Sequence, residues 1–123
     1  FFLESDLLSN IKSSPDIIVT NLPYIPSERI PYLDSSVSDF EPIIALDGGD
    51  DGFELYRKLF QQISLPPRGW TPKLIICEID YTHGELAVSE ALKYFPDAQV
   101  EVKTDLAQKQ RVLKIILPAG LPK

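Results

Sequence analysis

Apolar and polar positions follow two kinds of pattern along the chain. Runs rich in β-branched and aliphatic residues predict short strands, at residues 17–20, 73–79, 99–103 and 111–117. Apolar side chains at helical spacing predict two amphipathic helices, at residues 55–63 and 84–94. Strands that alternate with helices favour an α/β fold with a mostly parallel sheet, and the last two strands are near enough in sequence to form an antiparallel hairpin.

The start of the chain is less regular. Residues 1–6 resemble the end of a strand, and residues 7–12 predict a short helical turn that ends at a Ser-Ser-Pro break. Asp6 lies between the two, and it is either an acidic N-cap for the turn or a ligand for amino or hydroxyl groups.

Residues 25–50 contain three prolines and no sustained period. A loop of this length in a compact domain is usually functional or mobile, so we interpret it as a candidate substrate lid. Phe40 and residues 43–46 are expected to pack down onto the domain. A second loop, rich in proline, is predicted at residues 64–72.

Composition limits the class of protein. With 123 residues, 44% of them hydrophobic, the chain is large enough for one core and is expected to be one domain or part of one. Its net charge is −6 and it has no block of Lys or Arg, which favours a protein or small-molecule substrate over nucleic acid. The single cysteine, Cys77, excludes a disulfide framework and favours the cytoplasm. No stretch is long and apolar enough to predict a membrane span.

The first predicted strand is followed by four residues that can bind a ligand, Asn21-Leu22-Pro23-Tyr24. They lie at the sheet edge where open α/β folds bind ligands. The Asn21 amide and the Leu22 carbonyl together offer acceptors for both hydrogens of a planar NH2 group. The Tyr24 ring offers a face on which a planar amide or base can stack. This arrangement suits methyl transfer to an amide or amino nitrogen, but a strand end closed by an Asn-x-Pro turn explains the residues equally well.

Residues 47–52, Asp-Gly-Gly-Asp-Asp-Gly, invite a comparison with ligand-binding loops. Their spacing fits neither a calcium loop nor a nucleotide loop. We interpret them as a turn in which Asp51 and Glu54 form a capping box for the helix that follows.

Three further groups lie in or after the second predicted strand. Cys77 lies among isoleucines, so it is expected to be a buried hydrophobe and not the catalytic partner of His83. With one Cys and one His, the chain cannot build a metal site from these residues alone. Glu78 and Asp80 lie at the ligand edge, where they either line a site or are solvated.

Several motifs together are more specific than any one of them: Asn21 to Pro26, Phe40-Glu41-Pro42, Ala45 to Gly52 with Tyr56, Glu78 to Tyr81 with Gly84, Asp105-Leu106-Ala107 and Arg111-Val112. This combination resembles the HemK/PrmC family over nearly the whole chain. Members of this family are S-adenosylmethionine-dependent methyltransferases that modify the side-chain amide of a glutamine in peptide-chain release factors. An Asn-x-Pro-Tyr motif by itself is also found in enzymes that methylate adenine or cytosine.

The resemblance implies a Rossmann-like methyltransferase fold. Residues 1–123 would be a single partial domain, its carboxyl-terminal portion, without the glycine-rich cofactor loop of the family. Catalysis would fall to Asn21, Pro23 and Tyr24, and Leu22 would join these three in binding the substrate amide.

The resemblance also implies where the cofactor and partners bind. S-adenosylmethionine would contact Asp6, Leu7 and Asn21, and no metal is implied. The partner would be a release factor in the cytoplasm, with no membrane and no direct contact with nucleic acid. Glu41 and residues 48–52 would shape the site without reacting.

Three positions depart from the family pattern: Leu22 replaces a proline, Leu7 an aromatic residue and Asp80 a glycine. Leu22 keeps its carbonyl, so the amide site is expected to survive with a less rigid backbone. Since the chain also begins without Met, we expect a fragment that is inactive alone and binds S-adenosylmethionine weakly or not at all. Two alternatives remain open, an N6-adenine nucleic-acid methyltransferase and a non-catalytic, truncated methyltransferase-like module that binds a protein partner.

Overall fold

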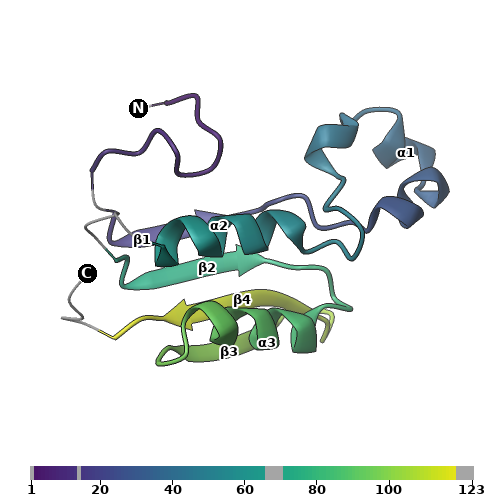
Figure 1. The fold of residues 1–123 in the computed structure, drawn as a ribbon. Coiled ribbons are helices and arrows are strands. Elements are labelled where there is room, and N and C mark those ends of the chain that lie inside the picture. The colour runs from purple at the N-terminus through teal and green to yellow at the C-terminus, as the bar shows by residue number, and fades with distance from the viewer. Residues whose placement is uncertain (1, 14, 66–70, 119–123) are drawn as a thin grey trace.

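The computed structural model describes residues 2–13, 15–65 and 71–118. In chain order its elements are β1 (Ile17–Thr20), η1 (Ser27–Tyr32), α1 (Ser35–Ser38), η2 (Ile43–Ala45), α2 (Glu54–Ser64), β2 (Leu74–Glu78), α3 (Gly84–Tyr94), β3 (Gln99–Thr104) and β4 (Gln110–Ile116). The strands form one sheet, with α2 and α3 over the same face (Figure 1). Most of the predicted loop at 64–72, residues 66–70, lies outside the described residues, as do Phe1 and Ser14.

The sheet is mixed, in the order β1-β2-β4-β3. β1 and β2 are parallel, with Ile18 opposite Ile75, whereas β4 runs antiparallel to both of its neighbours. The predicted carboxyl-terminal hairpin is therefore confirmed. The sheet is mixed and not clearly mostly parallel, because β1 pairs with β2 in parallel whereas both pairings of β4 are antiparallel. The crossover through α3 carries β3 two positions beyond β2, and β4 returns from the hairpin into the position between them.

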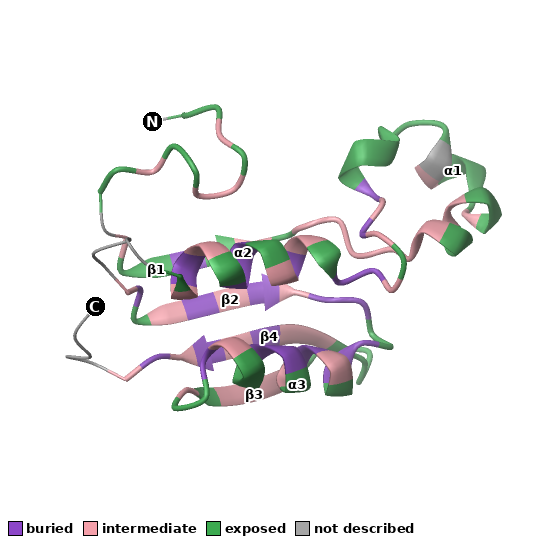
Figure 2. Cartoon of the chain, in the orientation of Figure 1, coloured by how far each residue is buried: buried purple, intermediate pink, exposed green. Residues whose placement is uncertain are grey.

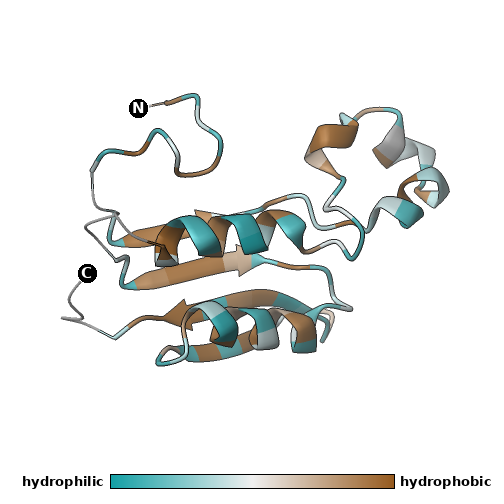
Figure 3. Cartoon of the chain, in the orientation of Figure 1, coloured by the Kyte–Doolittle hydropathy of each residue, from teal (hydrophilic) through white to brown (hydrophobic). Residues whose placement is uncertain are grey.

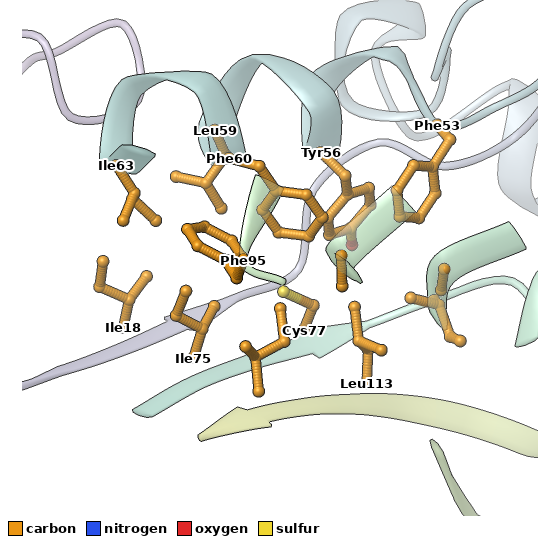
Figure 4. Packing of buried hydrophobic residues seen from close by; sticks show 14 of the residues in the cluster. Ile18, Phe53, Tyr56, Leu59, Phe60, Ile63, Ile75, Cys77, Phe95 and Leu113 are labelled. Carbon is orange, nitrogen blue, oxygen red and sulfur yellow. The ribbon is translucent and has the colours of Figure 1, made fainter. Parts of the chain in front are cut away.

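The core lies between the sheet and the two long helices (Figure 4). Alternate residues of β2, Ile75 and Cys77, point into it and are fully buried. From α2 come Tyr56, Leu59, Phe60 and Ile63, spaced as predicted for an amphipathic helix. Burying each large apolar side chain stabilises the fold by roughly 1.5–3 kcal/mol, so this layer fixes the position of both strand ends. Figure 3 shows a nearly continuous hydrophobic run along β2, whereas Figure 2 shows that buried and partly buried residues alternate along the same strand.

The first strand is less buried than its run of β-branched residues predicts, since such a run is typical of a short buried strand. Among the apolar residues of β1, Ile18 alone points into the core, on the same face as Thr20. Ile17 and Val19 point to the other face of the sheet and are 57% and 71% exposed. Because successive side chains of a strand point to opposite faces, a sheet with helices on one face buries only every second residue of β1.

The amino-terminal residues do not form the predicted strand. Residues 2–13 lie outside the sheet, and the Glu4 carbonyl accepts a hydrogen bond from the Asn10 side chain instead of from a neighbouring strand. A turn is present, since the Ser9 amide donates to the Asp6 carbonyl at 3.1 Å. The Asp6 carboxylate pairs with Lys58 at 2.6 Å, and no hydrogen bond by which it caps the turn is found among the described residues.

The segment from 25 to 50 holds short helical turns and extends beyond the carboxyl ends of β1 and β2 (Figure 1). Phe40 and residues 43–46 were expected to pack onto the domain, and of these Leu46 alone is buried. Phe40 and Ile44 are 82% and 84% exposed, and Ile43 is exposed as well. The cause is the tight turn of η2, which directs successive side chains around an axis instead of onto one face.

The start of α2 also differs from the expected capping box. Phe53 occupies the N-cap position and contributes no side-chain hydrogen bond. Asp51 accepts from the Phe53 amide at 2.9 Å and pairs with Arg57, while Glu54 lies 3.4 Å from the Asp50 amide. Both carboxylates therefore bind backbone amides near the helix start, but each amide belongs to the residue one position before the one expected for a capping box.

Candidate functional site

The ends of β1 and β2 are joined by one hydroxyl group. Tyr56, from α2, accepts a hydrogen bond from the Leu22 amide at 3.2 Å and donates to the Glu78 carbonyl. The Leu22 carbonyl lies 3.4 Å from the same hydroxyl oxygen, but the single hydroxyl hydrogen is directed to the nearer Glu78 carbonyl. The Leu22 carbonyl thus keeps acceptor capacity for another donor.

Tyr56 is fully buried, and its role at this joint was not apparent from the sequence, where it counted as one of the apolar positions of a helix. Burial raises the pKa of its hydroxyl far above the ordinary value, so the group remains a neutral donor and acceptor. The departure at Leu22 is part of this contact. A proline at that position has no amide hydrogen and could not bind Tyr56.

A cavity of about 340 Å³ opens beside the strand end. All four residues predicted to bind the substrate line it: Asn21, Leu22, Pro23 and Tyr24. Its other wall comes from the 25–50 segment and the end of β2, through Ile25, Leu33, Val37, Glu41, Ala45, Leu46 and Glu78. The segment predicted as a candidate lid therefore adjoins the residues predicted to bind substrate.

Tyr24 is half-buried in this wall. Burial raises the pKa of its hydroxyl, and the negative charge of Glu78 raises it further. The ring is therefore neutral at physiological pH and offers the aromatic face that the sequence predicted. Asn21 is exposed, so its carboxamide is accessible from solvent.

The glycine loop packs its backbone against the strand end. A Cβ atom at Gly48 would lie 2.8 Å from the Pro23 carbonyl oxygen and 2.8 Å from the Tyr24 Cα. Gly52 has a φ of +85°, and a Cβ there would lie 2.4 Å from the Tyr24 carbonyl oxygen. Only glycine permits this approach, so the loop shapes the site through its backbone.

The same loop is occupied by internal hydrogen bonds. Asp47 accepts from the Ser27 hydroxyl at 2.6 Å and from the Gly49 amide at 3.0 Å. Within the part of the chain that the structure describes, no group of three or more His, Cys, Asp or Glu residues is arranged to hold a metal ion.

Glu78 and Asp80, at and just beyond the end of β2, differ in environment. Asp80 is 3% exposed and is bound by the Thr82 amide at 3.0 Å and by Arg29 at 3.3 Å. Burial alone would raise the pKa of Asp80, but the hydrogen bonds from Thr82 and the charge of Arg29 lower it. Since Arg29 belongs to η1, this ion pair ties the 25–50 segment to β2. Glu78, in contrast, lines the cavity.

Of the three residues assigned to the cofactor by resemblance, Asp6 and Leu7 do not line the cavity. Asp6 is exposed and paired with Lys58. Leu7 packs against the core and has a φ of +54°, a backbone conformation that is uncommon for leucine. Asn21 alone belongs to both predicted sets.

Cys77 and His83 do not form a reactive pair. Cys77 is fully buried in the core, and burial raises the pKa of its thiol to about 11, so it remains protonated. His83 packs edge-on against Phe53, with ring centroids 6.4 Å apart. The interpretation of Cys77 as a buried hydrophobe agrees with this packing. No helix among the described residues is long and apolar enough to cross a membrane.

The fold and the cavity define a mixed α/β domain in which an asparagine, a leucine, a proline and a tyrosine line one pocket at the end of a strand. No protein-family model matches the chain. Curated relatives do match it. Over 116 residues it is 33% identical to the release factor glutamine methyltransferase of Lactococcus lactis, covering 93% of this chain and 42% of that protein.

Two further relatives carry the same name. The protein of Clostridium acetobutylicum is 39% identical over 100 residues, which cover 80% of this chain and 33% of the relative. The protein of Bacillus subtilis is 35% identical over 115 residues, covering 91% of this chain and 39% of the relative. The chain belongs to the release factor glutamine methyltransferase, or HemK/PrmC, family and spans less than half the length of these relatives.

Proposed function

We propose that this chain is part of an S-adenosylmethionine-dependent methyltransferase of Rossmann-like fold that methylates the side-chain amide nitrogen of a glutamine in a peptide-chain release factor. The relatives' names support the reaction and the substrate. The observation that carries the proposal is that Asn21, Leu22 and Tyr24 line one cavity. Together they match the shape and the hydrogen-bonding groups of a primary amide.

The substrate amide is held by three groups. The Asn21 side-chain oxygen and the Leu22 carbonyl each accept one N–H of the glutamine side chain. The Tyr24 ring stacks on the amide plane, and this fixes the direction in which the nitrogen lone pair points. Two acceptors on the same nitrogen raise its electron density, so orientation contributes more than a strong base does.

The cofactor residues fit this scheme in part. Asp6 and Asn21 are both exposed, so their oxygens are accessible to a cationic ligand, although Asp6 is also paired with Lys58. When bound, S-adenosylmethionine supplies an electrophilic methyl group. Asn21 and Leu22 would hold the nitrogen toward this methyl group. As the N–C bond formed, the bond between the methyl carbon and the sulfonium sulfur would break, its electron pair would stay on sulfur, and the nitrogen would then lose a proton to solvent.

Nuclear magnetic resonance of the isotope-labelled chain tests the proposal. A short peptide with one glutamine should shift the resonances of residues 21–25 and the side-chain amide of Asn21, whereas the same peptide with glutamate should not. The carboxylate offers no N–H to the two acceptors and is repelled by Glu78. Equal shifts with both peptides, or shifts confined to other residues, would contradict it.

No observation favours the alternatives of an adenine methyltransferase or a non-catalytic module. An enzyme that binds a duplex needs cationic side chains along the phosphate path. Of the residues that line the cavity here, the charged ones are both acidic, Glu41 and Glu78.

A further inference from the structure

Residues 28–45, here called the flap, form one wall of the cavity but have little apolar packing to hold them there. Leu33 and Val37 of the flap line the cavity. None of the flap side chains that the structure describes is buried, and Phe40 and Ile44 are largely exposed. In Figure 1 the flap, which carries α1, extends beyond the ends of the long helices. The hydrophobic effect therefore contributes little to its position.

The two ends of the flap meet at a short base. The Ile25 amide donates to the Leu46 carbonyl at 3.1 Å, and the Gly48 amide donates to the Ile25 carbonyl at 2.8 Å. Leu46 is buried, so the base is fixed to the domain. The base follows Tyr24 directly in the chain. A rotation of the flap about this base would change the width of the cavity and leave the amide-binding residues in place.

An ion pair crosses from the flap to the end of β2. Arg29 Nη1 lies 3.3 Å from Asp80 Oδ1, although the two residues are 51 positions apart. Asp80 is 3% exposed, and its other oxygen accepts a hydrogen bond from the Thr82 amide at 3.0 Å. Burial opposes the charged form, but the bonds from Thr82 and the charge of Arg29 outweigh it and lower the pKa of Asp80. The carboxylate is therefore a fixed, charged anchor for the flap.

The strength of this ion pair suits a reversible contact. The Arg29 side chain is 44% exposed and approaches Asp80 through one nitrogen. A partly exposed pair of this kind shifts an equilibrium between two states by up to about fivefold. The turn after β2 does not depend on it, because Thr82 binds the same carboxylate locally. The ion pair can thus favour one position of the flap without fixing it permanently.

We propose that the flap opens and closes over the cavity, and that Arg29 and Asp80 are positioning residues that form the latch of the closed state. The structure shows the latch formed. The proposal rests on the proposed function in one respect, since the ligand that the flap admits is taken to be a glutamine side chain carried by a protein. Such a side chain enters and leaves between the strand end and the flap, so the open fraction of the flap limits both rates.

Nitrogen-15 relaxation dispersion of the 123-residue chain without ligand measures the open fraction. Arg29→Ala should raise the open fraction of residues 28–45 by about threefold to fivefold over the wild type. Asp80→Asn should raise it by a similar factor. The double variant should add little to either single change, because both remove the same contact. The amides of α2 and β2 should show no change, since the opening is local.

Two further variants show whether the charge of Arg29 is responsible. Arg29→Lys should keep most of the closed state, because the contact is made by a single nitrogen and a lysine ammonium can replace it. Glu28→Gln is the matched control, since Glu28 is exposed in the same helical turn and does not line the cavity. It should leave the open fraction unchanged.

Binding rates distinguish a latch from a residue that only supports the fold. Line-shape analysis of a nuclear magnetic resonance titration with a short peptide containing one glutamine gives the association and dissociation rates. Arg29→Ala should raise both rates by the same threefold to fivefold, so the dissociation constant should change little. A purely structural role would weaken the complex through faster dissociation alone, and that result would contradict the latch.

The outcomes separate the latch from the proposed function. An unchanged open fraction in Arg29→Ala, or an equal rise in Glu28→Gln, would contradict the latch. If Asp80→Asn fails to fold, Arg29→Ala decides, because Arg29 is an exposed residue. If the ligand-free chain shows the expected rise but peptides with glutamine and with glutamate bind equally, the latch stands and the proposed function is contradicted.

Discussion

Replacing Tyr56 by phenylalanine removes one hydroxyl group from the joint between β1 and β2 and preserves the aromatic packing. The ring stacks on Phe53 with centroids 4.9 Å apart and an interplanar angle of 22°, and phenylalanine keeps this contact. The Leu22 amide loses its acceptor and the Glu78 carbonyl loses its donor. Because removing one partner leaves partly buried polar groups unsatisfied, the variant should lose about 1–3 kcal/mol of unfolding free energy.

Urea unfolding followed by circular dichroism measures this loss. For a domain of this size the loss lowers the transition midpoint by roughly 0.5–2 M. The matched control is Tyr94→Phe, since the Tyr94 hydroxyl accepts only a 3.4 Å hydrogen bond from Gln61 near the surface. That variant should change the stability by less than about 0.5 kcal/mol. Equal losses of stability in the two variants would refute the role that we assign to the Tyr56 hydroxyl in connecting β1 and β2.

The pH dependence of Tyr56→Phe gives an independent check. Because burial raises the pKa of Tyr56, the folded chain holds the phenol proton more tightly than the unfolded chain does. The resulting stability is fully present below the ordinary tyrosine pKa of 10.0 and is lost as the pH rises from there toward the raised value. Wild-type stability should therefore fall more steeply above about pH 10 than that of the variant.

Three other outcomes follow from the geometry. Gly48→Ala should destabilise the chain by about 1–3 kcal/mol, since its new Cβ would lie 2.5 Å from the backbone carbonyl oxygen of Gly52. Gly84→Ala should be nearly neutral, because its new Cβ would meet the flexible side chain of Gln110. Arg29→Ala should speed hydrogen exchange in residues 27–32 and lower the free energy of unfolding by about 1 kcal/mol above pH 4. This loss should fade as acid protonates Asp80. Lys73→Ala is the control and should change the stability little, because Lys73 forms only an exposed ion pair at 4.0 Å. Isothermal titration calorimetry of the isolated chain should show weak binding of S-adenosylmethionine or none, and tight stoichiometric binding would refute this.

The parts of the fold that depend on local pattern were predictable from the sequence. The helical spacing of Leu59, Phe60 and Ile63 predicts α2, and the apolar run at residues 73–79 predicts β2, because each pattern reflects one buried face. The hairpin of β3 and β4 followed from their short separation. Their place in the sheet did not, because insertion of β4 between β2 and β3 depends on pairing between distant segments.

The candidate site shows the same limit. The sequence identified the four residues at the end of β1, since an amide, a proline and an aromatic residue after a strand form a local pattern. It did not identify Tyr56 as their support, because a tyrosine on an apolar helix face gives no sign of where its hydroxyl points. Nor did it predict that Arg29 binds Asp80, which lies 51 positions away.

The departure at Leu22 has a physical consequence for the site. The ring of a proline restricts the backbone, whereas Leu22 offers an amide hydrogen that Tyr56 accepts at 3.2 Å. This hydrogen bond holds the strand end at the same point at which a proline ring would restrict it. The replacement does not remove the backbone carbonyl, which any residue at this position supplies.

The most direct test of the amide site compares three peptides that differ only in the hydrogens on the glutamine nitrogen: glutamine, N5-methylglutamine and N5,N5-dimethylglutamine. If Asn21 and the Leu22 carbonyl each accept one of these hydrogens, the affinity of the chain should fall at each step, and Asn21→Ala should abolish one of the two steps. Equal affinities for all three peptides would show that the two acceptors do not bind the amide, and the proposed site would be wrong.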